Sequence, residues 1–213
     1  MVPPPDRGSP GQAFPRRRLE VPWRPLPRMR RVALFIATSA DGFIARSNGS
    51  IDWLPTDGND YGYNAFIRTV DTILMGRKTY QLALTFDAFP YPDKECYVFS
   101  RKGGRLERDP RKPASVRIVR SDPVAFVRRL RRRKGATIWL VGGAHLIQPL
   151  QEASLIDEYI ISICPVFIGS GIPLFLNTDR QLPLNLTRHR IYKTGVVQLT
   201  YEKRRPLRLR GSP

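Results

Sequence analysis

The chain has 213 residues, of which 41% are hydrophobic and 25% are charged, and its formal net charge is +18. This apolar fraction excludes a wholly disordered chain, and the length predicts one domain with tails. No run approaches the roughly 18 uncharged apolar residues of a membrane-spanning helix, and the first 30 residues lack the apolar region of a signal peptide. We therefore expect a soluble, cytoplasmic protein with no membrane partner.

The two cysteines, Cys96 and Cys164, lie far apart in the sequence and form no CxxC pair. This spacing argues against a disulfide framework and against a cysteine zinc site, and two free thiols suit a reducing compartment. The sequence therefore predicts no metal site.

Half of the positive excess lies near the two ends of the chain. Residues 1–28 contribute +4, residues 203–213 contribute +5, and the segment between them contributes +9. A basic surface binds phosphates nonspecifically, but the sequence has no zinc-finger spacing, RNA-recognition aromatic motif or basic-leucine heptad. Nucleic acid is therefore an unlikely main partner, and a small-molecule substrate is expected instead.

The composition divides the chain into a domain and two tails. Residues 1–28 hold eight prolines, which predict a disordered Pro/Arg-rich tail and forbid the amphipathic helix of a transit peptide. Met29 stands directly before a strand pattern, so we expect residues 1–28 to be dispensable or not translated in the cell. Residues 29–203 form the expected domain, and residues 204–213 a basic tail.

In chain order, the first half alternates strands with helices. An apolar run at 32–38 ends in the turn sequence Ser39-Ala40-Asp41-Gly42, and a polar loop follows at 46–60. The remaining elements expected there are a helix over 61–70, a strand over 72–75, a helix from about residue 78, and strands over 96–99 and 116–119.

The second half continues the alternation. Ser121 is a fitting N-cap for a helix that Gly135 would end, and the run from Arg131 to Lys134 reads as a solvated helix face. The elements that follow are a strand over 137–141, a helix over 144–152 that Pro149 must kink or shorten, a strand over 156–168 interrupted by Pro165, and a hairpin over 187–194 and 196–203 around Gly195. This order predicts an α/β fold with a mixed, mostly parallel sheet covered on both faces.

Four short motifs fall at the carboxyl ends of expected strands, and these ends meet at one edge of a parallel sheet, where open α/β folds bind ligands. Two of them are strand–glycine–helix junctions, where the backbone can approach a ligand and a helix N-terminus offers N–H groups to a phosphate. Each motif alone is ordinary turn chemistry, and Trp53 and Trp139 read as packing residues. Their coincidence favours a dinucleotide site. The motifs are Ser39-Ala40-Asp41-Gly42, Gly76-Arg77-Lys78-Thr79, Ser100-Arg101-Lys102 and Gly142-Gly143-Ala144-His145.

The same motifs, with the residues around them, resemble the dihydrofolate-reductase-like family. The closest branch is the reductase domain of bifunctional riboflavin-biosynthesis deaminase-reductases, here as a stand-alone domain. The resemblance implies a three-layer α/β/α fold with a C-terminal antiparallel hairpin, and NADPH as hydride donor. It rests on the segments VALFIATSADGFIA (32–45), DWLP (52–55), ILMGRKTY (73–80), WLVGGA (139–144), DEY (157–159) and PVFIGSGIPLF (165–175).

Carried over position by position, the resemblance implies where a cofactor would bind. Gly76, Arg77 and Thr79 would hold its phosphates, and Ser100 and Arg101 would meet the adenosine 2′-phosphate. The pyrophosphate and nicotinamide ribose would be held by the segment Gly142, Gly143, Ala144, His145 and Leu146, and the nicotinamide slot would be lined by Ala37 and Ile44.

The choice between NADPH and NADH follows from the residues after the strand at 96–99. NAD sites usually place an acidic side chain on the ribose 2′-hydroxyl, whereas a 2′-phosphate needs arginine and hydroxyl donors. Ser100, Arg101 and Lys102 supply the second set, so the sequence predicts NADPH.

We therefore expect an NADPH-dependent reductase of a small heterocycle, either 5-amino-6-(5-phosphoribosylamino)uracil-like or pterin-like. The candidate proton donors are Asp41 and then Asp60, with an ordered water as a substitute. The chain offers no clear equivalent of the pterin-binding carboxylate of dihydrofolate reductases, and it has no deaminase signature. Two alternatives stay open, a non-catalytic nucleotide- or nucleic-acid-binding module and a true dihydrofolate reductase, and so does a homodimer.

Overall fold

The computed structural model describes residues 29–102 and 104–204, so the expected tail at 1–28 and residues 205–213 of the C-terminal tail lie outside the described residues. The strands are β1 (Val32–Ser39), β2 (Phe43–Ala45), β3 (Val70–Gly76), β4 (Glu95–Phe99), β5 (Val116–Val119), β6 (Thr137–Gly142), β7 (Glu158–Cys164), β8 (Ile172–Pro173), β9 (Leu184–Ile191) and β10 (Val197–Lys203). The helices are α1 (Tyr63–Ile67), α2 (Arg77–Ala83), α3 (Gly104–Glu107), α4 (Pro123–Leu130) and α5 (Ala144–Glu152).

Eight of these strands form one mixed sheet in the order β5-β4-β3-β6-β1-β7-β10-β9. The first six run parallel, and β10 pairs antiparallel with both β7 and β9. The expected sheet and its C-terminal hairpin are therefore confirmed. Because the six parallel strands point the same way, their carboxyl ends share one edge of the sheet.

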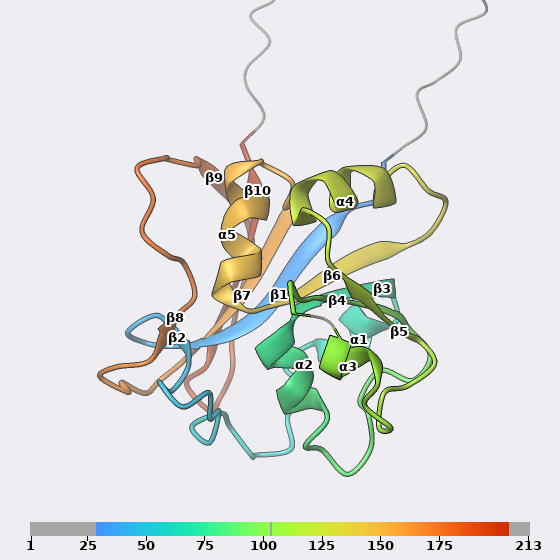
Figure 1. Ribbon diagram of the computed structural model, residues 1–213. Coiled ribbons are helices and arrows are strands. Elements are labelled where there is room, and N and C mark those ends of the chain that lie inside the picture. Colours follow the sequence, from blue (N-terminus) through green and yellow to red (C-terminus); the bar gives the residue numbers. More distant parts are fainter. Residues whose placement is uncertain (1–28, 103, 205–213) are drawn as a thin grey trace, which may run out of the picture.

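Alternating side chains give the sheet two buried faces and the fold three layers. In β1, Val32 and Leu34 pack with apolar residues of α4 and α5, whereas Ala33 packs with the cluster that includes Phe66 of α1 and Tyr80 of α2. Figure 1 shows α4 and α5 next to each other over their part of the sheet. This alternation is the two-residue period of a strand whose two faces are both covered.

Two buried arginines and their carboxylate partners tie the amino edge of the sheet together. The Arg30 guanidinium pairs with Asp71, and the Arg131 guanidinium donates to both carboxylate oxygens of Asp157 at 3.0 and 2.9 Å. Arg131 is only 8% exposed, so the expectation of a solvated helix face is wrong at this residue. It lies just after α4, where its side chain also donates to the Arg30 carbonyl at 3.0 Å, and these partners compensate its desolvation.

Helix α4 begins later and ends earlier than the sequence predicted. Its N-cap is Asp122, whose carboxylate accepts from the Ala125 N–H at 2.7 Å, so the assignment of Ser121 as the cap is wrong. Pro123 occupies the first helical turn, where proline is tolerated. The helix ends at Leu130, so Gly135 does not supply its stop; that glycine has a φ of +153° beside the side chains of Arg30 and Asp71.

Other elements also differ from the sequence prediction. Helix α1 stops at Ile67, because both the N–H and the hydroxyl of Thr69 donate to the Phe66 carbonyl and Val70 already belongs to β3. Strand β7 ends at Cys164, just before Pro165, and Pro149 leaves α5 continuous over the expected range. The short ladder of β2 and β8, and the single turn α3, carry no clear sequence signal.

Candidate functional site

A cavity of about 920 Å³ opens at the carboxyl edge of the sheet. The ends of β1, β3, β4, β5 and β6 line it, together with β2, the loop after β2, and β8. All twelve residues that were expected to bind a cofactor lie in its wall: Ala37, Ile44, Gly76, Arg77, Thr79, Ser100, Arg101, Gly142, Gly143, Ala144, His145 and Leu146.

The ends of β3 and β6, which are neighbouring strands, approach each other closely in the wall of this cavity. A Cβ atom added to Gly76 would lie 3.5 Å from the Gly143 nitrogen and 3.7 Å from the Gly142 carbonyl oxygen. Gly142 has a φ of +134°, a backbone conformation that favours glycine, and its peptide bond to Gly143 is cis. The two glycine motifs therefore bring backbone into the wall of the cavity.

Helix α5 points its N-terminus into the cavity. Gly143 is its N-cap and has no side chain to accept from the first N–H groups. The first helical hydrogen bond runs from Leu146 N to the Gly143 carbonyl at 2.9 Å, so the N–H groups of Ala144 and His145 precede it. A nine-residue helix with this end in a cavity provides donors and a partial positive charge to an anion.

The cations of the cavity are all on one side. We call Arg77, Lys78, Arg101 and Arg120 the cationic rim; they follow β3, β4 and β5, three neighbouring strands of the sheet. Arg120 donates to Glu107 of α3 at 2.7 Å, and this pair is solvent-exposed. Among the described residues, Arg77 and Arg101 form no ion pair, and both are exposed.

The opposite side of the cavity is apolar. We call this part the apolar compartment. It comes from β1, β2, the loop that follows β2, and β8. Ala45 and Ile172 are paired between β2 and β8, which places the short ladder in the cavity wall. The residues of the compartment are Phe35, Ile36, Ala37, Ile44, Ala45, Gly49, Ile51, Leu54 and Ile172.

Sequence reasoning missed two groups of lining residues. The first is Arg120, Ser121, Asp122 and Pro123, which follow the predicted strand β5 and could have been found by applying the strand-end argument to it. The second is the loop and ladder part of the apolar compartment other than Ile44, which the sequence predicted. Nothing local in the sequence indicates that these segments fold over the ends of β1 and β6.

Asp41, the first candidate proton donor, lies outside the cavity wall. Its carboxylate accepts from the N–H groups of Ile168 and Gly169, at 3.1 and 2.8 Å, and so fastens the segment before β8 to the turn after β1. The Ser39 side chain and these two N–H groups hold the pKa of Asp41 below its ordinary value. The structure thus gives this carboxylate a structural role, and the expected proton transfer by Asp41 remains untested.

Asp60, the second candidate, lies two residues before Gly62, the N-cap of α1. Its carboxylate accepts from the N–H groups of Gly62 and Asn64, both at 3.1 Å. These bonds lower the pKa of Asp60, so it is ionised at neutral pH. It does not line the cavity either, and its proposed role in proton transfer also stays untested.

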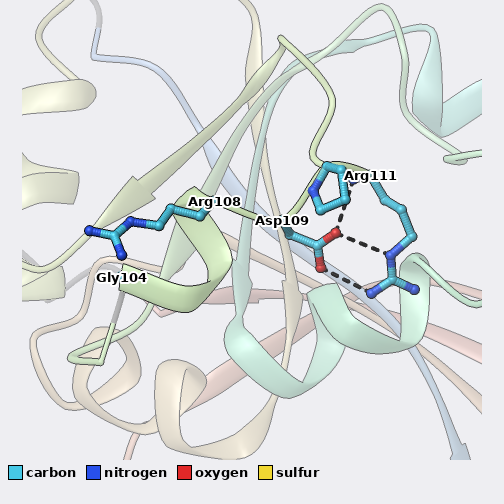
Figure 2. Close-up of a pocket in the computed structure, with 5 residues that line it drawn as sticks. Gly104, Arg108, Asp109 and Arg111 are labelled. Carbon is cyan, nitrogen blue, oxygen red and sulfur yellow. Dashed lines mark hydrogen bonds and ion pairs between the residues drawn. The ribbon is translucent and has the colours of Figure 1, made fainter.

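A second hollow lies beside α3, where Gly104, Arg108, Asp109, Pro110 and Arg111 form its wall. Figure 2 shows the Asp109 carboxylate facing the Arg111 guanidinium, with Arg108 pointing away from the pair. The Arg111 side chain donates to Asp109 at 3.1 and 2.9 Å. Because this carboxylate already has its partner and no expected site residue is present, the cavity at the sheet edge is the candidate site.

Two further properties bear on the class of site. Within residues 29–102 and 104–204, no group of three or more His, Cys, Asp or Glu side chains is arranged to hold a metal ion. In the same part of the chain, no helix combines the length and the apolar character that crossing a membrane requires.

Comparisons with known proteins agree with this geometry. Residues 30–198 match the family model of the RibD C-terminal domain. The uncharacterized protein YwjB of Bacillus subtilis (strain 168) is 42% identical over 175 residues, which cover 81% of this chain and 97% of YwjB.

Solved structures of other proteins also resemble this chain. A protein from Shewanella sp. PV-4 named for riboflavin biosynthesis superposes with a TM-score of 0.72 and 30% identity, covering 82% of this chain and 99% of that one. Dihydrofolate reductase from Enterococcus faecalis, complexed with NADP(H), superposes with a TM-score of 0.58 and 15% identity, covering 81% of this chain and 96% of that enzyme. The similarity to dihydrofolate reductase shows a shared fold. Together with the family match, these findings make the chain a member of the RibD C-terminal domain family, with a dihydrofolate-reductase-like fold.

Proposed function

We propose that this protein is an NADPH-dependent reductase that transfers hydride to a small planar heterocycle or to another conjugated C=N or C=O group. One observation carries the proposal: a single cavity joins a cationic rim, a glycine-rich backbone cradle with a helix N-terminus, and an apolar compartment. A dinucleotide that presents a reactive ring to a substrate needs these three environments in this order. Membership of the RibD C-terminal domain family supports a reductase role.

The residues of the cavity fit the polar part of NADPH. Arg101 and Ser100 follow β4 and would hold the 2′-phosphate, with Arg77 and Thr79 of the neighbouring junction beside them. The N–H groups of Ala144 and His145 would hold the pyrophosphate. Because neither Gly76 nor Gly143 carries a side chain, the backbone there can approach the cofactor.

The apolar part of the site fits the nicotinamide. Ala37 and Ile44 would line its slot, and Gly142 would lie beside it at the end of β6. When bound, NADPH would supply the hydride. The chain's own contribution would be to hold the ring against the substrate and to exclude water from that contact.

The reaction also needs a proton at the heteroatom of the reduced group. Asp122 is the one carboxylate in the cavity wall, among the described residues, and it caps α4 on the cationic side. An ordered water entering from the open side of the cavity would therefore supply the proton.

Calorimetric titration with NADPH and NADH tests the proposal. We expect NADPH to bind at least tenfold more tightly, because the 2′-phosphate gains charge-assisted hydrogen bonds from the cationic rim. Equal dissociation constants for the two cofactors would overturn the NADPH assignment, and no binding of either would overturn the reductase function.

A further inference from the structure

Among the residues that the structure describes, the apolar compartment contains no polar side chain. Its nine residues are four isoleucines or leucines from β2, β8 and the loop, three residues of β1, and Ala45 and Gly49. The charged and hydroxyl-bearing residues of the cavity belong instead to the ends of β3, β4 and β5, and His145 belongs to α5. The division follows the sheet order, since β6 lies between β3 and β1.

The charged side chains in the segments around the compartment are held by other partners. Arg46, directly after β2, donates to Asp52 at 2.7 Å, and both are exposed. The Arg46 guanidinium and the Ser50 hydroxyl lower the pKa of Asp52 to about 2, so that carboxylate stays ionised. The carboxylate of Asp57 accepts from the Tyr61 hydroxyl. Asp41 and Asp60 accept the hydrogen bonds described above. Each of these charged side chains therefore already has a local partner.

This arrangement decides what can enter beside the cofactor. A phosphate or carboxylate placed against these apolar side chains loses its hydration and gains no charged side chain of the compartment in return, which makes the transfer unfavourable. An uncharged aromatic or conjugated ring loses little by the same transfer and gains apolar contact.

We propose that the apolar compartment selects an uncharged, planar, unphosphorylated carbonyl or imine compound as the substrate. This inference rests on the proposed NADPH-dependent reduction and narrows it. A conjugated ring without a phosphate suits the compartment, whereas a ribosyl phosphate such as that of 5-amino-6-(5-phosphoribosylamino)uracil finds none of the cations of the cationic rim there. The cationic rim is already assigned to the cofactor's own phosphates.

The reaction then balances without a charged protein group in the compartment. The carbon of the C=O or C=N group accepts the hydride, and the π electrons of that bond move to the heteroatom. The heteroatom takes one proton from water, which gives an alcohol or an amine, and NADPH leaves as NADP⁺.

A matched pair of fluorescent probes tests this selection directly. N-phenyl-1-naphthylamine is uncharged, and 8-anilino-1-naphthalenesulfonate is the same ring system with one sulfonate; both become fluorescent when an apolar site buries them. The two probes are titrated into the full chain, first alone and then with saturating NADP⁺, which covers the cationic rim. NADP⁺ binding is measured separately by calorimetry.

Variants locate the probe. Ile51 and Leu54 are half-buried residues of the loop in the compartment wall, and Ile51→Arg and Leu54→Arg each place a cation there. The control is Leu186→Arg on β9, because Leu186 is 53% exposed on an edge strand and could bind the probe nonspecifically. Melting curves show which variants fold. Because two loop positions are changed independently, the test still gives an answer if one of the two loop variants does not fold.

We expect the uncharged probe to bind at least tenfold more tightly than the sulfonate in the presence of NADP⁺. Ile51→Arg or Leu54→Arg should reverse that preference, and Leu186→Arg should leave it unchanged. Equal binding of the two probes, no binding of the uncharged one, or a preference that only Leu186→Arg alters would overturn the inference. A preserved probe preference without NADP⁺ binding would instead refute the proposed function and leave the compartment's selectivity standing.

Discussion

At the scale of single residues, cofactor choice depends on guanidinium groups that have room to meet a ligand. Arg101 is exposed at the end of β4, lines the cavity, and forms no ion pair among the described residues. Arg120 lines the same side but is already paired with Glu107. The contrast makes Arg101 the stronger candidate for the 2′-phosphate.

Replacing Arg101 with alanine should weaken NADPH binding roughly tenfold to a hundredfold, because a charge-assisted hydrogen bond contributes about 1.5–3 kcal/mol. NADH binding should change little, since NADH has no phosphate there to lose. Calorimetry of both cofactors measures the effect, and Arg188→Ala on the exposed strand β9 is the control with the same change in charge. An equal loss of affinity for both cofactors would mean that Arg101 stabilises the fold or binds the pyrophosphate. Unchanged affinity for both cofactors would indicate that Arg77 or Lys102 binds the 2′-phosphate instead.

Replacing Asp41 with asparagine should destabilise the protein and leave the rate of hydride transfer within about threefold. The reason is that the carboxylate accepts from Ile168 and Gly169 and does not line the cavity. The folded-state pKa of Asp41 is lowered, so its contribution is present above the unfolded pKa of about 3.9 and is lost as the pH falls through the folded value. The melting temperatures of variant and wild type should therefore converge in acid. A fall in kcat of a hundredfold or more at neutral pH would restore Asp41 as the proton donor.

At the scale of elements, the sequence predicted the strands that build the site better than the helix ends beside them. Strand–glycine–helix junctions carry local signals, and both of them line the cavity. The cap of α4 was ambiguous because Ser121 and Asp122 are both good N-cap residues. Pro123 resolves the choice, since proline favours the first helical position and so marks the residue before it as the cap. The burial of Arg131 was not predictable, because its partner Asp157 lies 26 residues further along the chain.

The paired substitutions Asp122→Ala and Ser121→Ala test the cap. Asp122→Ala should cost about 1 kcal/mol of unfolding free energy, because it leaves the Ala125 N–H without its side-chain acceptor. Ser121→Ala should change stability by less than about 0.5 kcal/mol, as is usual for an exposed position. Urea denaturation of both variants gives the two values, and equal losses would contradict the assignment.

At the scale of the whole molecule, the sequence indicated the class of fold and the edge that carries the site, but not how the cavity is closed. Alternating strands and helices predict a parallel sheet, and the carboxyl ends of its strands then meet by geometry. The apolar compartment depends on β8 pairing with β2, across more than a hundred residues of chain. Such contacts are set by packing of the complete fold, so the sequence missed Ile51, Leu54 and Ile172 while it found Ala37 and Ile44.

Removing residues 1–28 should leave the melting temperature and NADPH affinity unchanged, because the residues of the sheet and the cavity all lie beyond them. Removing residues 1–31 is the matched control. It takes away Arg30, which donates to Thr72 at 2.8 Å and to the Ala136 carbonyl at 2.8 Å and pairs with Asp71, and it should lower the melting temperature clearly. A large loss in the shorter truncation would show that residues 1–28 contribute to the fold.

The most direct measurement of the central claim is a crystal structure of the protein soaked with NADPH. We predict electron density for the nicotinamide against Ala37 and Ile44, for the pyrophosphate at the N-terminus of α5, and for the 2′-phosphate at Arg101, with the apolar compartment open beside the ring. Density for the dinucleotide elsewhere on the surface, or a cavity that stays empty at saturating NADPH, would contradict the account.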